Sequence, residues 1–394
     1  MTGSYVLFQN LTRNPLRTGL TVVAFALPMA IFVAAISMVT SLIEIGKAAE
    51  KELRLAVHHK TTLTNLLPEG ARRKIEALDP DGTRLSAVCG MRWFGGQVPN
   101  TQDTLTSLAA DVDTFPQVYS DAELTPAEIE EWNRERTACV VGFAIAEKYG
   151  WRVGQRIVLN STVPPYLELE FRIVKVMTSK TRANFFYFRR DYLTDSLEEA
   201  TNDSELYQTS RCNIFWVKCN SAADLRALQT EVDALFANTP DETKSEDENA
   251  FGANFTQAAG NIPGLMQAMA IVVVCIIGLV AGNTMMMSLR ERTRELAVFK
   301  AIGFQSSRVF AIVLAESLLL AALGALAGVL PMSLILWQFP VRGLGFGPLS
   351  ALEVSPPAVI GSIVIALTIG LVSGLWPAFQ AMRLRTVDAL RRVA

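Results

Sequence analysis

Hydrophobic residues gather in four long stretches of this chain, and none of these stretches contains a charged side chain. A helix of about 20 apolar residues can cross a bilayer, and each stretch has at least 25 residues. Buried helices of a large soluble protein are the alternative, but four such stretches in one chain argue against it. We therefore predict four transmembrane helices, because backbone groups in lipid must be satisfied within the segment itself. The stretches are Thr18–Ile43, Asn261–Leu289, Ser317–Val341 and Val354–Met382.

The long insertion between the first two stretches has a different pattern. Ser41–Val57 keeps helical spacing and predicts a helical stalk that continues the first membrane helix. The two ends of the insertion indicate helix then strand at 70–94 and strand then helix at 212–239, which predicts an α/β subdomain. The middle, 138–177, contains short strands with alternating polarity and predicts an inserted β-rich subdomain. The acidic run Pro240–Asn249 is interpreted as a solvated loop.

Charge is distributed unevenly, although the formal net charge is only −2. The N-terminal flank, the loop after the second stretch and the C-terminal tail together hold 11 Lys or Arg and 3 Asp or Glu. Residues 44–262 hold 24 and 33, respectively. Because Lys and Arg are enriched in cytoplasmic loops near membrane helices, the three basic segments are predicted to be cytoplasmic. Both termini would then lie in the cytoplasm, and residues 44–262 outside it.

The predicted fold is an α-helical membrane protein with four transmembrane helices and an extracytoplasmic α+β domain between helices 1 and 2. The first stretch is too long for a cleavable signal peptide, so we expect it to be retained. The predicted segments are a cytoplasmic interfacial helix (1–17), transmembrane helix 1 (18–43), the extracytoplasmic domain with its stalks (44–262), transmembrane helix 2 (263–289), a cytoplasmic helical loop (290–308), transmembrane helix 3 (309–336), an extracytoplasmic loop (337–356), transmembrane helix 4 (357–382) and a cytoplasmic tail (383–394).

Glycines recur four residues apart in each of the last three hydrophobic stretches. Pairs with this spacing let two helix backbones approach closely. They predict close packing, either within one bundle or across a dimer, and the sequence leaves both alternatives open. The pairs are Gly278/Gly282, Gly324/Gly328 and Gly370/Gly374.

One acidic residue, Glu316, lies within the third apolar region, eight residues after Arg308. A carboxylate at the bilayer centre costs about 3 kcal/mol on insertion scales. Glu316 is two helical turns from the cytoplasmic end, close enough to pair with a basic neighbour. A structural ion pair and a role in transmitting motion are both consistent with this position.

No motif for catalysis is recognisable in the chain. It contains no GxxxxGK[ST] phosphate loop and no GxSxG or HExxH motif. The carboxylate pairs Asp111/Asp113 and Glu168/Glu170 are interpreted as solvated surface. We therefore predict a non-enzymatic membrane protein with no bound cofactor or metal and no nucleic-acid partner. Four cysteines of the insertion allow three full disulfide pairings, among which the sequence cannot choose: Cys89, Cys139, Cys212 and Cys219.

The segment Met285–Arg308 concentrates charges between two apolar stretches. Read as a helix, it places Leu296, Phe299 and Ile302 along one ridge and Gly303 at the position of a C-terminal cap. A narrow apolar ridge with a charged flank suits docking in a groove of another protein. Anchoring to anionic lipid through the arginines is the alternative, but the acids and the ridge favour a protein partner.

The same segment carries a family resemblance. Gly282–Phe304 reads GNTMMMSLRERTRELAVFKAIGF, and Ala315–Leu330 reads AESLLLAALGALAGVL. Together they resemble the MacB/FtsX-like permease family of ABC transporters. NPLRTGLT, AMRLRTVDALR and GFAIAEKYGWRVGQRIVL are similar to the N-terminal, C-terminal and outer-domain signatures of that family.

The resemblance implies a subunit that pairs with a second copy or a paralogue in the bacterial inner membrane. It implies a MacB-like periplasmic core domain with a porter-like part, and ATP and Mg bound by a separate ABC ATPase, because no fused ATPase domain is recognised. ATP-driven motion would pass to the outer domains by mechanotransmission. By the same resemblance, the helix that couples to the ATPase would comprise Arg290, Glu291, Arg294, Glu295, Leu296, Phe299, Lys300 and Gly303.

Two functions fit this resemblance. One is export or extraction of a substrate from the periplasm or outer leaflet, with a periplasmic adaptor and an outer-membrane channel as further partners. The other is an FtsX-like transmitter that activates a periplasmic cell-wall hydrolase. By the same resemblance, an outer domain of about 200 residues favours the exporter or lipoprotein-release type, because division-type transmitters tend to have smaller outer domains.

Overall fold

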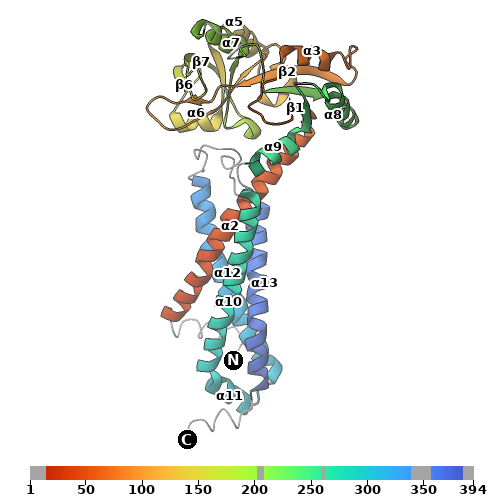
Figure 1. The fold of residues 1–394 in the computed structure, drawn as a ribbon. Coiled ribbons are helices and arrows are strands. Elements are labelled where there is room, and N and C mark those ends of the chain that lie inside the picture. The colour runs from red at the N-terminus through yellow and green to blue at the C-terminus, as the bar shows by residue number, and fades with distance from the viewer. Residues whose placement is uncertain (1–14, 202–207, 259–261, 339–355, 385–394) are drawn as a thin grey trace. The chain divides into compact units, whose positions relative to one another are not determined.

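The computed structural model describes residues 15–201, 208–258, 262–338 and 356–384 (Figure 1). Residues 42–261 form one compact unit, here called the inserted domain, and the helical segments before and after it form a second. Residues 1–14 of the predicted interfacial helix, nearly all of the loop at 337–356 and most of the tail at 383–394 lie outside the described residues, and residues 15–17 begin α2.

The helical unit contains four helices that are long and apolar enough to cross a membrane. One precedes the inserted domain and three follow it, so this part of the predicted fold is confirmed. The candidate spans are Thr18–Ser41 in α2 (Pro15–Lys51), Gln267–Glu291 in α10 (Ile262–Glu291), Ser306–Leu336 in α12 (Ser306–Gln338) and Pro356–Arg383, which is α13.

Close backbone approach packs α12 against α2 and α13. A Cβ atom at Gly328 would lie 2.2 Å from the carbonyl oxygen of Ala26, and one at Gly370 would lie 2.4 Å from the Cβ of Ala321. In contrast, a Cβ at Gly282 on α10 would meet nothing within 4 Å. The predicted glycine pairs therefore differ: those of α12 and α13 lie in close contacts within the chain. On α10, a Cβ at Gly278 would reach only ordinary contact with Ile369 of α13, at 3.9 Å. The glycines in close contacts are Gly324, Gly328, Gly370 and Gly374.

The inserted domain is built on one sheet of ten strands in the order β10-β1-β9-β2-β4-β8-β5-β7-β6-β3. The pairs β4–β8 and β5–β7 are parallel, and the others are antiparallel. The strands are β1 (Arg54–His59), β2 (Leu85–Trp93), β3 (Gly96–Gln97), β4 (Thr106–Ala110), β5 (Ala138–Gly142), β6 (Arg156–Ser161), β7 (Glu168–Met177), β8 (Phe185–Arg189), β9 (Ile214–Cys219) and β10 (Thr243–Asp247).

Short helices cover this sheet. The predicted helix–strand and strand–helix ends are present as α3–β2 and β9–α8, and the predicted β-rich middle is present as β5 to β8. The two parts share one continuous sheet, joined where β2 pairs with β4. The helical elements are α3 (Glu69–Glu76), α4 (Phe115–Val118), η1 (Ser120–Ala122), α5 (Pro126–Arg134), α6 (Phe143–Tyr149), η2 (Lys180–Arg182), α7 (Arg190–Ala200), α8 (Ala222–Phe236) and α9 (Glu248–Ala258).

Two local predictions about this domain are wrong. The stalk helix does not continue to Val57, because α2 ends at Lys51 and Leu53 turns the chain into β1 with a φ of 50°. The acidic run is not a solvated loop, because its centre is the edge strand β10, where Glu246 is 7% exposed. Lys244 and the Asn254 amide bind the Glu246 carboxylate, which makes its burial tolerable.

Asp111 also departs from its interpretation as solvated surface. Its carboxylate accepts hydrogen bonds from the Gly90 backbone N–H at 2.8 Å and from Arg72 at 3.1 Å, and it pairs with Arg190. Asp113 is exposed, as are both members of the second carboxylate pair. The four cysteines of the domain are buried free thiols, and the described residues include no cluster of three metal-ligand side chains.

Candidate functional site

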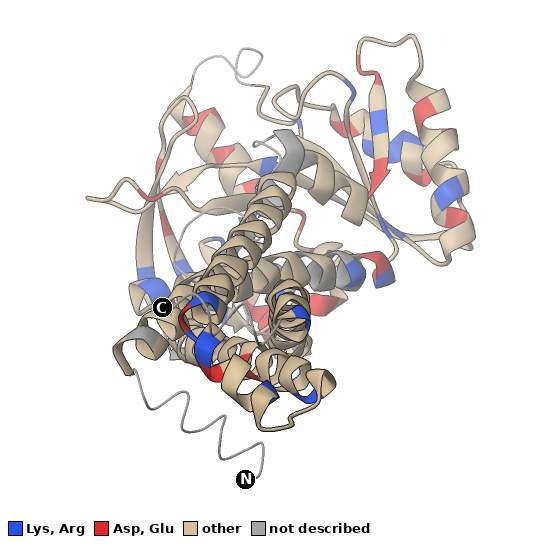
Figure 2. Cartoon of the chain, turned by 90° about the horizontal axis from the view of Figure 1, so that it is seen from below, with Lys and Arg blue, Asp and Glu red and all other residues tan. Residues whose placement is uncertain are grey.

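The turn between α10 and α12 holds most of the sequence-predicted site residues. Along the long helices the ribbon carries almost no charge, whereas charged residues gather at this turn (Figure 2). Our prediction of one continuous helix from Arg290 to Gly303 is wrong. The backbone breaks at Arg292, with φ −101° and ψ 9°, and the short helix α11 (Thr293–Ala301) follows.

The end of α11 matches the predicted cap. Gly303 has a φ of 101°, a backbone conformation that residues other than glycine adopt only with strain. This turn lets the Phe304 N–H donate to the Phe299 carbonyl at 3.0 Å and the Gly303 N–H donate to the Lys300 carbonyl at 3.1 Å. The Phe299 and Phe304 rings pack 5.3 Å apart across it. Gly303 therefore closes α11 and redirects the chain into α12.

An ion pair ties the start of α11 to α12. Arg292 Nη1 lies 2.8 Å and 2.9 Å from the two carboxylate oxygens of Glu316. Glu316 is only 9% exposed, so a basic partner is needed to make a carboxylate tolerable there. The ion-pair interpretation of Glu316 is thus confirmed. Arg292 was absent from the predicted site residues, because the sequence alone does not show which of the nearby arginines reaches Glu316.

A second contact ties the other end of α11 to α13. The ammonium group of Lys300 donates to the carbonyl oxygens of Met382 at 2.6 Å and Leu384 at 2.9 Å. These carbonyls belong to the C-terminal end of α13, where a cation also interacts favourably with the helix dipole. α11 is therefore held by α12 at one end and by α13 at the other.

The predicted docking ridge is wrong in its orientation. Leu296 is 6% exposed and packs against the bundle, and Phe299 is half-buried beside it. Of the ridge, only Ile302 is solvent-exposed, at 71%. Helical periodicity shows which residues share a face, but not which face the bundle covers. The residues packed around Leu296 are Leu289, Val309, Val313, Ala378 and Ala381.

The exposed side of α11 is a different row of residues. Arg294, Val298 and Ile302 follow one another at four-residue spacing, and all three are exposed. We call these three residues the outward α11 face. Of the other predicted coupling residues, Arg290 and Glu291 at the end of α10 are exposed, whereas Glu295 is half-buried. Val298 was not predicted, although its spacing from Arg294 and Ile302 would have indicated it.

The clamp on α13 can be tested directly. We expect Lys300→Met to destabilise the packing of α11 on α13 by about 1.5 kcal/mol, because it removes two charge-assisted hydrogen bonds. Hydrogen exchange of the backbone amides in α11 and at the end of α13 measures the change in the detergent-solubilised protein. Arg308→Met removes an exposed cation from the start of α12 and serves as the control. Equal effects of both substitutions would contradict the clamp.

Comparisons with known proteins bear on the class of this chain. A model described as "MacB-like periplasmic core domain" matches residues 18–235, and one described as "FtsX-like permease C-terminal" matches residues 268–386. The chain is 23% identical to a Nitrobacter winogradskyi protein named "Macrolide export ATP-binding/permease protein MacB" over 98% of this chain and 59% of the relative. It is 34% identical to the Bacillus subtilis "Uncharacterized ABC transporter permease YvrN" over 28% of this chain and 25% of the relative.

A third relative is the Pseudomonas fluorescens "Pyoverdine export ATP-binding/permease protein PvdT", 25% identical over 79% of this chain and 46% of the relative. The chain thus spans between 25% and 59% of the length of these relatives. The solved extracellular domain of the Gram-positive transporter YknZ aligns with 49% of this chain and 99% of that domain at 12% identity, with a TM-score of 0.34. That score is too low to establish a shared fold.

Four membrane-length helices with one large domain inserted after the first indicate an integral membrane protein. The core-domain model covers more than half of the chain, and the second model covers the three helices that follow. The chain belongs to the MacB/FtsX-like permease family of ABC transporters.

Proposed function

We propose that this chain is the permease subunit of an inner-membrane ABC transporter and that a separate ABC ATPase docks on the outward α11 face. In this proposal both termini and α11 are cytoplasmic, and the inserted domain is extracytoplasmic. ATP and Mg bind to the ATPase, and its movement passes through the helices to the inserted domain. The result is export or extraction of a substrate from the periplasm or outer leaflet by mechanotransmission.

The double attachment of α11 is the observation that carries this proposal. Arg292 joins α11 to α12, and Lys300 joins it to α13. A partner that pushes on α11 therefore cannot move it without moving both helices. A helix that merely rested on lipid would have no need of contacts at both ends.

Continuity of α2 supports the transmission step. This helix runs without interruption from Pro15 to Lys51, whereas its membrane-length part ends at Ser41. The last ten residues of α2 belong to the inserted domain. In this proposal, a displacement of the membrane part passes along α2 into that domain.

The names of the relatives favour export over the alternative. Two of the three are named as export proteins, one for macrolides and one for pyoverdine. The alternative, an FtsX-like activation of a periplasmic cell-wall hydrolase, would use the same ATPase contact but a hydrolase as the outer partner. We therefore place export first and leave the substrate undefined.

Substitutions on the outward α11 face test the ATPase contact. We expect Val298→Asp with Ile302→Asp to reduce the amount of co-purified ATPase by about tenfold or more, because a buried carboxylate at the centre of an interface is strongly unfavourable. Each candidate ABC ATPase of the source genome is co-expressed with the tagged full-length chain, and the ratio of the two chains is measured after purification.

A matched control separates docking from general damage. Val153 and Val163 lie in the inserted domain and are 62% and 40% exposed, similar to Ile302 and Val298. Val153→Asp with Val163→Asp therefore adds the same charge elsewhere and should leave the ratio unchanged. In a Cys275→Ser background, Ile302→Cys labelled with a thiol-reactive photo-crosslinker should also become joined to the ATPase on illumination. An undiminished complex with both aspartates present, and no crosslink from position 302, would disprove docking on this face.

A further inference from the structure

Four charged side chains form a closed ring inside the inserted domain. Arg54 donates to Glu248 at 2.5 Å and to Asp121 at 2.6 Å. Arg182 completes the ring, because it contacts Asp121 at 3.3 Å and also pairs with Glu248. Each carboxylate thus bridges both guanidinium groups, and positive and negative charges alternate around the ring.

The ring is buried and tightly packed. The side chain of Arg54 is fully buried, and those of the other three members are at most 15% exposed. The two guanidinium groups lie 4.6 Å and 4.5 Å from the centre of the Tyr119 ring, an arrangement that favours cations. Burial alone would raise the pKa of Asp121, but the attraction of Arg182 and Arg54 outweighs it and holds that pKa well below its usual range.

The ring joins elements that are far apart in the chain. Arg54 is the first residue of β1, three residues after α2 ends, and Glu248 is the first residue of α9, the helix that precedes α10. Asp121 belongs to η1 and Arg182 to η2. The segment by which the chain enters the inserted domain and the segment by which it leaves are therefore both bound to the same two turns.

The turn η2 is itself fixed to the β-rich part of the sheet. A Cβ atom at Gly142 would overlap the backbone of this turn, 2.2 Å from the Ala183 carbonyl oxygen. The N–H of Ala144 on α6 donates to the same carbonyl at 3.1 Å. A displacement of η2 thus reaches the start of α6 through backbone contacts.

We propose that Arg54, Asp121, Arg182 and Glu248 are positioning residues that pass a displacement of α9 to η2 and α6. This inference rests on the proposed function, because mechanotransmission is the process that the connection would serve. A buried ring of alternating charges is well suited to it. Opening one contact leaves an uncompensated buried charge, so the ring resists gradual sliding and moves as a unit. The apolar contacts of α9 can slide without leaving a charge unpaired. An example is the contact of the Phe251 ring with the Trp216 ring, whose centres lie 5.4 Å apart.

A coupling experiment on the full-length chain in detergent tests this proposal without any ATPase. Phe251→Ala loosens α9 from the sheet, and hydrogen exchange is followed in the peptides that cover η2 and the start of α6. With the ring intact, we expect this substitution to raise exchange there by about threefold or more. In a chain that also carries Arg182→Met and Glu248→Gln, the added effect of Phe251→Ala on these peptides should vanish, while its effect on β10 persists.

The double ring variant keeps the bidentate Arg54–Asp121 contact and the balance of charge. Its matched control is Arg84→Met with Glu231→Gln, which removes a half-exposed ion pair between α8 and the residue that precedes β2. In that control the threefold effect should be retained. If the ring double variant does not fold, Glu248→Gln alone replaces it, because it weakens only the α9 end of the ring.

The outcomes are distinct. Loss of the effect in the ring variant and its retention in the control support the proposal. An effect of Phe251→Ala that is equally large with and without the ring overturns the proposal, and so does no effect with the ring intact. If the ring only stabilised the domain, its removal would lower the stability without changing the transmission from α9 to η2. Failure of the ATPase to dock on α11 would instead defeat the proposed function and leave this coupling result unaffected.

Discussion

Gly328→Val should destabilise the helical unit by about 3 kcal/mol or more, because overpacking at a close helix contact forces backbones apart. The new Cβ atom would lie 2.2 Å from the Ala26 carbonyl oxygen on α2. A backbone atom cannot move aside as a flexible side chain can, so α12 and α2 would have to separate. The temperature at which the detergent-solubilised protein loses its monodisperse chromatographic peak measures the effect.

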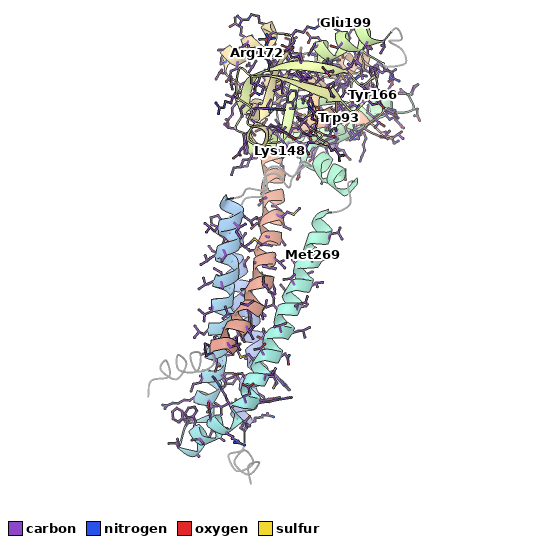
Figure 3. All side chains as sticks on the ribbon, turned by 90° about the vertical axis from the view of Figure 1, so that its left-hand side faces the viewer. Trp93, Lys148, Tyr166, Arg172, Glu199 and Met269 are labelled. Carbon is purple, nitrogen blue, oxygen red and sulfur yellow. The ribbon has the colours of Figure 1, made fainter. Side chains whose placement is uncertain are left out.

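Gly282→Val is the matched control for this prediction. It introduces the same branched side chain into a membrane-length helix, but nothing lies within 4 Å of its Cβ position. We expect its stability to stay within about 0.5 kcal/mol of the unsubstituted chain. Met269 on the same helix is 52% exposed and points outward (Figure 3), as expected for a helix with an open face. If both valine substitutions destabilise the protein equally, the loss does not come from the close contact between α12 and α2 at Gly328.

The contrast between these two glycines illustrates how far sequence can predict this fold. The four long helices were predictable because a bilayer demands a minimum apolar length, and length is directly readable in a sequence. The cap at Gly303 was predictable because it depends on neighbouring residues only. The partner of each glycine pair was not predictable, since all three pairs have the same spacing while only those of α12 and α13 lie at close helix contacts within the chain.

The candidate site shows the same limit. Periodicity correctly placed Leu296 and Phe299 on one side of α11, but the bundle covers that side. The prediction that Pro240–Asn249 is a solvated loop failed for a related reason. One of the side chains that bind Glu246 is Asn254, which lies beyond this run on α9. The charge ring is the extreme case: Arg54 and Glu248 are 194 residues apart, and no local pattern connects them.

Asp121→Asn should destabilise the inserted domain by about 3 kcal/mol at neutral pH, because removing one member of a buried charge network leaves its partners uncompensated. Asp121 accepts two hydrogen bonds from Arg54, at 2.6 Å and 3.2 Å, and another from Thr181 at 3.0 Å. Asparagine is similar in size but carries no charge. The two arginines would then share Glu248, and Arg54 would keep in addition the longer contact with Glu52, at 3.7 Å. Urea unfolding followed by the fluorescence of the buried Trp132 and Trp216 measures the loss.

The pH dependence of this loss distinguishes a charge effect from a packing effect. Because the folded-state pKa of Asp121 is depressed, its contribution is fully present above the unfolded value of about 4 and is lost as the pH falls through the lower folded value. The difference between the original chain and Asp121→Asn should therefore be constant from about pH 7 to pH 5 and shrink below pH 4. Asp113→Asn changes an exposed carboxylate nearby and should show almost no difference at any pH. A difference for Asp121→Asn that stayed constant into strong acid would mean that shape, not charge, holds the ring together, and the alternating charges would then no longer explain why α9 and η2 are joined there.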